Sequence, residues 1–249
     1  MRGQTTASFP SDRHIAITVT TEPPPRHAIA WFDRQVAASV RPGSTVLNIG
    51  AGSNRSGRFP KVRSRAGVVV GIDPDAGIEN NRCVDETWRT TLEDFAPLHP
   101  GEFDAAFSVF VLEHVADPEG FVRAAATVLK PGGSLVCLTV NKWHYFGLTT
   151  WATTRLGVAD WLLGKLRDPD LVRNYHFPTE YRMNTIGSIS RLLDDAGFRA
   201  AEFHMWDLPA LYEPYLPARL SVIASRWQAF AYHLNNPHLM GNLTVKALR

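Results

Sequence analysis

Two short apolar runs, each ending in residues suited to a ligand, constrain the fold of this chain more than any other feature. The first run, 45–49, enters the turn Gly50-Ala51-Gly52 directly, and the second run, 68–72, ends in Asp73. A buried parallel strand entering a glycine turn has this pattern, because glycine bends tightly and admits a ligand without a Cβ in the way. An acidic residue at the tip of the next strand is placed to hold two ribose hydroxyls. The two runs therefore predict an α/β fold that binds a nucleoside-containing cofactor.

Composition narrows the class of protein. The chain has 249 residues, of which 45% are hydrophobic and 20% charged, as in a soluble globular domain with a substantial core. The net charge of +2 gives no reason to expect a nucleic-acid partner. Cys83 and Cys137 form no spaced pair, which favours free thiols in a reducing compartment. No signal peptide or membrane-spanning run is recognisable, so we expect a cytoplasmic protein.

The order of the expected elements indicates how the sheet is built. Residues 1–25 are polar and end in three prolines, which predicts an N-terminal arm, and a helix is expected over 26–40. The other expected elements are strands near 83–88, 102–112, 134–140 and 201–206, helices after Asp117 and over 184–196 and 217–234, and an edge strand over 242–248. Alternating strands and helices predict a parallel sheet covered on both faces, with ligands at the carboxyl ends of its strands.

Two segments interrupt this alternation and are expected to form a cap over the strand ends. They span about 142–183 and 207–240, and the first is dense in aromatic residues. Within them, 146–166 and 216–234 have the spacing of amphipathic helices. Three interpretations stay open for these helices: they pack on each other, they line an apolar acceptor channel, or they rest on a membrane surface.

Six short pieces in this order resemble the class I S-adenosylmethionine-dependent methyltransferases, within the methyltransferase type 11-like family. The pieces are Val46-Leu-Asn-Ile-Gly-Ala-Gly52, Val70-Gly-Ile-Asp-Pro74, Glu102-Phe-Asp104, Val111-Leu-Glu-His-Val115, Leu129-Lys-Pro-Gly-Gly133 and Asp195-Ala-Gly-Phe198. The resemblance implies a doubly wound, seven-stranded, mainly parallel Rossmann-like sheet over 26–249, with the last strand antiparallel and the cap inserted. It also implies S-adenosyl-L-methionine as cofactor and S-adenosyl-L-homocysteine as product.

The resemblance also assigns cofactor contacts to positions of this chain. Glycines 50 and 52 would pass under the methionine and adenosine parts, Asp73 would bind the ribose hydroxyls, and the backbone N–H of Leu92 would recognise adenine. The whole expected set is Asn48, Gly50, Ala51, Gly52, Asp73, Pro74, Thr91, Leu92, Val109 and Phe110. Asn48 and Thr91 stand where the family usually has acids. A nicotinamide-binding domain is the rival, but it would need a glycine where Arg55 stands and a full helix where Pro60 interrupts.

Methyl transfer is an in-line displacement, so the protein mainly aligns the reactants and excludes water. A general base is needed only for a weakly acidic hydroxyl or a protonated amine. The candidates are His114 at a strand end and His144, His176 and Tyr181 in the cap. Each has a plainer alternative role in packing or hydrogen bonding. The histidines lack the spacing of metal ligands, so no metal is expected.

The sequence thus predicts a methyltransferase acting on a small-molecule, glycan or lipid-like acceptor. Methylation of oxygen is favoured over carbon or nitrogen. A competing hypothesis from a different class is a degenerate fold that binds the cofactor or a partner protein without turnover. The acceptor's identity and the oligomeric state are left open by the sequence.

Overall fold

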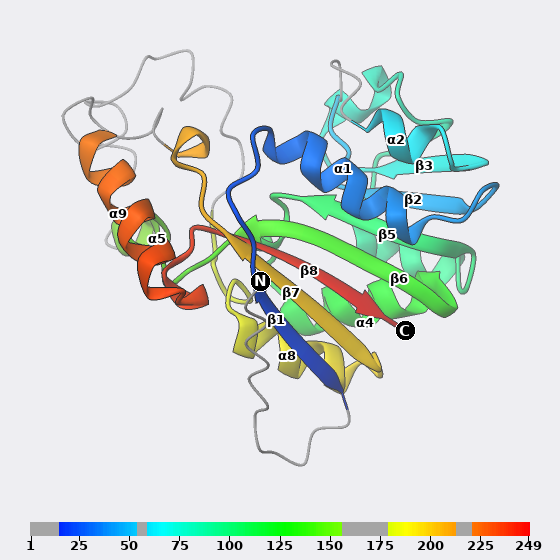
Figure 1. The fold of residues 1–249 in the computed structure, drawn as a ribbon. Coiled ribbons are helices and arrows are strands. Elements are labelled where there is room, and N and C mark those ends of the chain that lie inside the picture. The colour runs from blue at the N-terminus through cyan, green and yellow to red at the C-terminus, as the bar shows by residue number, and fades with distance from the viewer. Residues whose placement is uncertain (1–14, 54–58, 156–178, 213–220) are drawn as a thin grey trace.

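A single eight-stranded sheet forms the centre of the molecule (Figure 1). The computed structural model describes residues 15–53, 59–155, 179–212 and 221–249. The sheet order is β1-β7-β8-β6-β5-β2-β3-β4. The strands are β1 Ala16–Thr21, β2 Thr45–Ile49, β3 Val68–Ile72, β4 Glu86–Trp88, β5 Phe103–Val109, β6 Leu129–Val140, β7 Ala200–Trp206 and β8 Asn242–Leu248. Every neighbouring pair is parallel except the two that β8 makes, which confirms a mainly parallel sheet with an antiparallel last strand.

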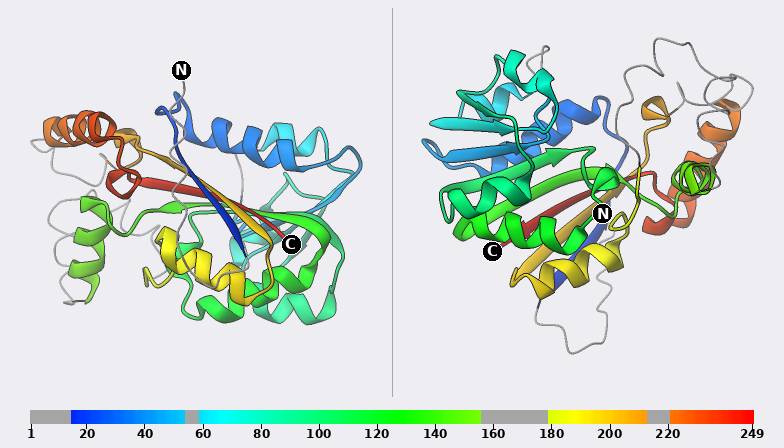
Figure 2. Two further views of the ribbon diagram at one scale, coloured as in Figure 1. Left: turned by 60° about the horizontal axis from the view of Figure 1, so that its bottom comes forward. Right: turned by 180° about the vertical axis from the view of Figure 1, so that it is seen from behind.

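Helices cover both faces of this sheet, as expected for a doubly wound fold (Figure 2). The described helices are α1 Ala28–Ser39, α2 Pro60–Arg63, α3 Leu92–Phe95, α4 Pro118–Val128, α5 Tyr145–Arg155, α8 Ile186–Asp195 and α9 Ser221–Leu234. One core lies under α1 and α2 and includes Phe32 and Phe107, both almost fully buried. The other lies under α3, α4 and α8 and includes Phe121 and Leu192. The two cores explain why most strands are apolar on both faces.

The two longest helices of the second face begin where their capping residues predict. Asp117 precedes Pro118, and its carboxylate accepts a hydrogen bond from the Gly120 N–H at 3.0 Å. Thr185 and Ser188 form a reciprocal capping box at the start of α8. Such caps satisfy N–H groups that have no partner within the helix. They fix the direction in which the chain leaves the strand-end loops.

Two expectations about the sheet edges were wrong. Seven strands were expected, but part of the segment expected as an N-terminal arm forms β1, which pairs in parallel with β7. Its run of β-branched residues suits a strand. The strand over 242–248 was expected at an edge, but β8 lies between β6 and β7. Thr244, a polar residue of its alternating pattern, is buried. Its hydroxyl accepts a hydrogen bond from Trp206 Nε1 at 3.3 Å, which satisfies the buried group.

Each of the two expected insertions leaves and rejoins the sheet at one place. The Lys142 N–H donates to the carbonyl of Asn184 at 2.9 Å, which joins the ends of the first insertion. The Gly241 N–H donates to Asp207 Oδ1 at 3.1 Å, which joins the ends of the second. Their helices α5 and α9 lie side by side at one end of the molecule (Figures 1 and 2), with the rings of Tyr145 and Trp227 5.3 Å apart. Residues 156–178 and 213–220 lie outside the described part of the chain.

Candidate functional site

The glycine turn after β2 is held tightly against the neighbouring strand ends. The N–H groups of Gly50 and Ala51 both donate to the carbonyl of Ile72, at 2.9 and 3.0 Å. Gly50 has φ +69°, and a Cβ built on it would lie 2.3 Å from Val111 Cγ2. Gly52 has φ +52°. The ends of β2 and β3 and the loop after β5 therefore meet at this turn, and its first glycine has no room for a side chain.

Asp73 is the acidic group at this meeting point. Its Oδ2 accepts the Gly52 N–H at 2.9 Å, and its Oδ1 accepts the Asp75 N–H at 2.8 Å. A carboxylate oxygen offers about two acceptor sites, so each oxygen keeps one for a ligand hydroxyl. The residue is 9% exposed, so its orientation is fixed. This pair of acceptor oxygens fits a ribose, whose two adjacent hydroxyls need two acceptors.

Asn81 was not among the residues that the sequence singled out, yet it holds the same turn. Its Nδ2 donates to the carbonyls of Ala51 and Gly52, at 3.3 and 3.0 Å. Its Oδ1 accepts the Cys83 N–H at 2.8 Å. Asn81 lies in a segment without clear periodicity, so no pattern in the sequence pointed to it.

The expected adenine loop lies next to Asp73. The Thr90 N–H donates to the carbonyl of Asp73 at 3.2 Å. Thr91 is the N-cap of α3, where its hydroxyl accepts the Asp94 N–H at 3.2 Å. Leu92 is the first residue of that helix, so its N–H has no acceptor within the helix. Pro74 accepts a hydrogen bond from Arg89 Nε at 3.3 Å. The structure thus brings Asp73, Thr91 and Leu92 together.

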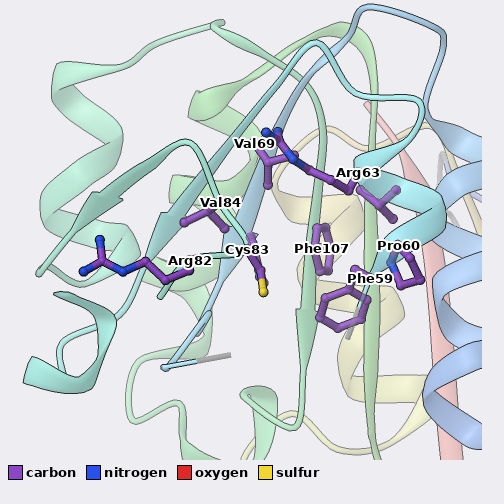
Figure 3. Close-up of a pocket in the computed structure, with 10 residues that line it drawn as sticks. Phe59, Pro60, Arg63, Val69, Arg82, Cys83, Val84 and Phe107 are labelled. Carbon is purple, nitrogen blue, oxygen red and sulfur yellow. The ribbon is translucent and has the colours of Figure 1, made fainter. Parts of the chain in front are cut away.

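Asn48 lies in β2, two residues before the glycine turn. It lines a cavity of about 260 Å³ bounded mainly by α2 and by residues 82–84, with one residue from each of β2, β3 and β5 (Figure 3). The rings of Phe59 and Phe107 meet at 4.8 Å in its wall, and Cys83 lies beside them. Asn48 is 4% exposed. Its contact with the methionine end of a cofactor remains a prediction.

Phe110, directly after β5, has an unusual backbone conformation. Its φ is +53°, while its N–H donates to the carbonyl of Leu138 at 2.8 Å. A bulky residue at positive φ is strained and persists only where its surroundings over-determine it. This conformation turns the chain sharply between Val109 and the short 3₁₀ segment Leu112–His114. The expected neighbours of the sulfonium, Val109 and Phe110, therefore lie at a forced bend beside the glycine turn.

A buried polar network places His114 close to Tyr181. The carbonyl of Glu113 accepts the N–H groups of Glu180 and Tyr181, at 2.7 and 3.1 Å. The buried carboxyl of Glu113 accepts the hydroxyl of Thr139 at 2.8 Å. Burial raises the pKa of Glu113, and the nearby His114 acts in the opposite direction. His114 is half-buried, whereas Tyr181 is almost fully buried at φ +51°.

His144 belongs to a different cluster, under the cap. Its Nε2 lies 3.7 Å from Asp207 Oδ1, and both side chains are buried. Burial lowers the pKa of His144 to about 3 and raises that of Asp207 to about 6. The hydroxyl of Tyr212 donates to both oxygens of Asp207, at 3.2 and 3.1 Å, and burial raises the Tyr212 pKa. The cluster ties α5 to the ends of β7 and β8, away from the glycine turn.

Of the four candidate bases, the three that lie in the described residues are not all brought together. His114 and Tyr181 are neighbours at the end of β5, His144 lies in the buried cluster, and His176 is outside the described residues. No group of three His, Cys, Asp or Glu residues that could hold a metal is found within residues 15–53, 59–155, 179–212 and 221–249. None of the helices in that part of the chain is long and apolar enough to cross a membrane.

Comparison with known families matches the central part of the chain. A family described as a methyltransferase domain matches residues 47–137, which include the glycine turn and Asp73. A ubiquinone biosynthesis O-methyltransferase of Xanthomonas campestris pv. campestris (strain B100) is 35% identical over 130 residues, 47% of this chain and 53% of that protein. A demethylmenaquinone methyltransferase of Tropheryma whipplei (strain Twist) is 42% identical over 103 residues, 39% of this chain and 42% of that protein. The chain spans about half the length of the curated relatives it matches.

Solved structures resemble the whole fold. A SAM dependent methyltransferase from Archaeoglobus fulgidus has a TM-score of 0.58 and 14% identity, over 90% of this chain and 96% of that one. An S-adenosylmethionine dependent methyltransferase from Mesorhizobium loti has a TM-score of 0.56 and 22% identity, over 89% and 98%. At these identities the likeness to the solved structures shows the fold alone.

Proposed function

We propose that this chain, which carries a class I S-adenosylmethionine-dependent methyltransferase domain, methylates a hydroxyl of a small quinone- or quinol-like acceptor. Such domains use S-adenosyl-L-methionine as cofactor. The acceptor class follows from the names of the ubiquinone and demethylmenaquinone methyltransferases among its relatives. Oxygen is favoured over carbon because the polar groups at the end of β5 suit removal of a hydroxyl proton.

One observation carries the proposal above the others. The glycine turn, Asp73 and the Thr91–Leu92 helix start are joined by hydrogen bonds at one edge of the sheet. Gly52 and Asp75 donate to the Asp73 carboxylate and leave one acceptor site on each of its oxygens. These residues fit the nucleoside half of the cofactor. When bound there, the cofactor supplies an activated methyl group.

The residues after β5 have the remaining tasks. Phe110 and Val111 form the wall beside the turn, where they exclude water from the reacting groups. We assign His114 as the base, which would take the acceptor's hydroxyl proton on an imidazole nitrogen as the oxygen bonds to the methyl carbon. The bond from that carbon to sulfur would break, and S-adenosyl-L-homocysteine would leave. Glu113 is its positioning residue, since its buried carboxyl lies near His114 and is held by Thr139. Tyr181 closes this side through the Glu113 carbonyl.

Titration calorimetry with S-adenosyl-L-methionine and S-adenosyl-L-homocysteine tests the cofactor half. We expect both to bind with one site per chain. Methyl transfer is then measured with a water-soluble quinol carrying a short isoprenoid tail, and the product's mass and NMR spectrum locate the new methyl group. Binding of the cofactor without methyl transfer to any such acceptor would favour a non-catalytic protein. The presence of Asn48 and Thr91, where the family usually has acids, is the observation that supports this alternative. A new carbon–carbon bond would contradict the O-methylation.

Substitution His114→Gln tests the assigned base. Glutamine keeps a polar side chain of similar size but takes up no proton, so we expect kcat to fall about 10²–10⁴-fold. The KM and the cofactor affinity should stay unchanged. His238→Gln is the control, because His238 is an exposed histidine on the segment before β8. An unchanged kcat and pH–rate profile in His114→Gln would show that His114 has only a structural role.

A further inference from the structure

The outer side of α9 exposes a row of apolar side chains to solvent. Val222, Ile223, Phe230 and Leu234 are each at least half exposed, at 50–59%. Ile223, Phe230 and Leu234 are seven and four residues apart, so they follow one line along the helix. We call these four residues, with the exposed Arg226 and His233 beside them, the α9 face. Apolar residues gathered in this way on a surface mark an interaction site.

The inner side of the same helix is firmly anchored, so the exposure is a property of the folded protein. Ala224 and Ala231 are fully buried. Trp227 Nε1 donates to the carbonyl of Leu239 at 3.0 Å, and Gln228 Nε2 donates to the carbonyl of Asp207 at 2.7 Å. The hydroxyl of Tyr232 donates to the carbonyl of Glu22 at 3.0 Å. Rotating the helix to bury the α9 face would break all of these bonds.

Helices α5 and α9 themselves contain no acidic residue. The chain contains 24 acidic residues, but none lies between 214 and 249, and none lies between 142 and 159, which includes all of α5. The basic residues of these segments include Lys142, Arg155 and Arg226. Leu148 on α5 and Trp143, two residues before that helix, are also exposed. An amphipathic helix with apolar and basic residues and no acids is typical of helices that lie in a bilayer interface.

We propose that the α9 face docks on an anionic phospholipid bilayer. The bilayer supplies an apolar layer for Ile223, Phe230 and Leu234 and negative headgroups for the basic residues. A second copy of the chain fits less well, because two such faces would bring like charges together without an acidic partner. The proposal deepens the function proposed above, because a quinone-like acceptor with an apolar tail dissolves in the same layer.

The position of α9 in the fold gives the docking a consequence. The helix is bound through Asp207 to the carboxyl end of β7, and through Trp227 and Tyr145 to α5, which follows β6. Docking through the α9 face would therefore hold the strand-end edge of the sheet near the membrane surface. An acceptor would then pass from the bilayer to the end of β5 without crossing bulk water.

Vesicle flotation of the full chain tests this proposal without any need for catalysis. The probes are vesicles of phosphatidylcholine alone and vesicles of equimolar phosphatidylcholine and phosphatidylglycerol. We expect the protein to float with the anionic vesicles, to bind neutral vesicles at least tenfold more weakly, and to be released by high salt. A protein that stays at the bottom of the gradient with both kinds of vesicle overturns the proposal.

Variants locate the contact. Ile223→Gln with Phe230→Gln should abolish flotation, and Arg226→Gln should weaken it about fivefold. Matched controls away from α9 are Leu98→Gln, an exposed leucine, and Arg123→Gln, an exposed arginine on α4; both should float like the parent. Flotation that survives the double substitution would overturn the assignment of the face. A dimer that the same double substitution dissociates, without flotation of the parent, would identify a second copy as the occupant instead.

Calorimetry separates the two proposals. A protein that floats but binds no S-adenosyl-L-methionine would retain the docking surface and lose the proposed function. A protein that binds the cofactor and methylates a water-soluble acceptor but never floats would retain the proposed function and lose the docking surface.

Discussion

At the residue scale, Asp73 connects the fold to the proposed chemistry, because it binds two backbone N–H groups and keeps acceptor sites for a ligand. We expect Asp73→Ala to weaken cofactor binding by about 5- to 150-fold, or about 1–3 kcal/mol. Asp73→Asn should be no milder, since its NH₂ group would face the N–H of Gly52 or of Asp75. Calorimetry measures both. Asp195→Ala, at an exposed carboxylate on α8, is the control and should bind like the parent.

Gly50 provides a second residue-scale prediction. Gly50→Ala adds a Cβ that would lie 2.3 Å from Val111 Cγ2 and places alanine at φ +69°. We expect a loss of unfolding free energy of about 2–4 kcal/mol, from overpacking and from backbone strain together. The double variant Gly50→Ala with Val111→Ala removes the clash and keeps the strain. In urea denaturation, Gly50→Ala should therefore cost less unfolding free energy in the Val111→Ala background than in the parent. An equal cost in both backgrounds would contradict the contact.

The sequence predicted part of this site and missed part of it for a physical reason. The glycine turn, Asp73 and the Thr91–Leu92 start all stand next to a strand or a helix cap, and such positions have local signatures. Asn81 and Thr139 act through hydrogen bonds to distant segments, and no local pattern marks a residue for that. For the same reason, the sequence did not show that His144 would be buried against Asp207.

At the element scale, the His144–Asp207 pair joins α5 to β7 and β8, and its titration should make opposite contributions to stability. The folded pKa of His144 is lowered to about 3, so its contribution falls as the pH drops below about 6.5, where the unfolded chain takes up a proton. The folded pKa of Asp207 is raised to about 6, so its contribution rises as the pH drops from about 6 to 4. The two trends should nearly cancel between pH 6 and 4.

Single variants expose each trend. Relative to the parent, Asp207→Asn should lose about 1.4 kcal/mol of unfolding free energy for each unit by which the pH falls from 6 to 4. His144→Gln should instead gain a similar amount over the same interval. Urea denaturation at several pH values measures both slopes, and the double variant should be flat against the parent. Equal slopes in the two single variants would show that this pair does not titrate as described.

Elements with strong local signals were predicted well, and the sheet edges were not. The helix after Asp117 and the strands that end at Gly50 and Asp73 follow from capping and periodicity. By contrast, β1 and β8 were misjudged, because strand order depends on pairings between residues far apart in the sequence. An alternating pattern, as in β8, shows that the two faces of a strand differ in polarity. It does not show whether the polar face meets water or a buried hydrogen-bonding partner, as Thr244 meets Trp206.

At the scale of the whole molecule, β1 is the edge strand next to β7 and keeps β7 inside the sheet. It pairs with β7 from Ala16 to Thr21. Deleting residues 1–21 should leave β7 paired with β8 alone, lower the thermal midpoint and promote association through the newly exposed edge of β7. Light scattering during a thermal ramp measures this. A deletion of residues 1–14 retains β1 and is the control; equal scattering from the two truncated proteins would contradict the role of β1.

Because the ends of each insertion are joined, changes in the length of the two insertions have a small effect on the sheet. Lys142 meets Asn184, and Asp207 meets Gly241, so each excursion from the sheet is already a closed loop. The entropy of closing a loop grows only with the logarithm of its length, at about 0.6 kcal/mol for each doubling. A change in the length of either loop therefore adds little closure entropy, and the hydrogen bonds that join its ends are separate from those between Gly52 and Asp73. A chain built this way can be refitted for a new acceptor by swapping a loop, with its cofactor edge left as it is.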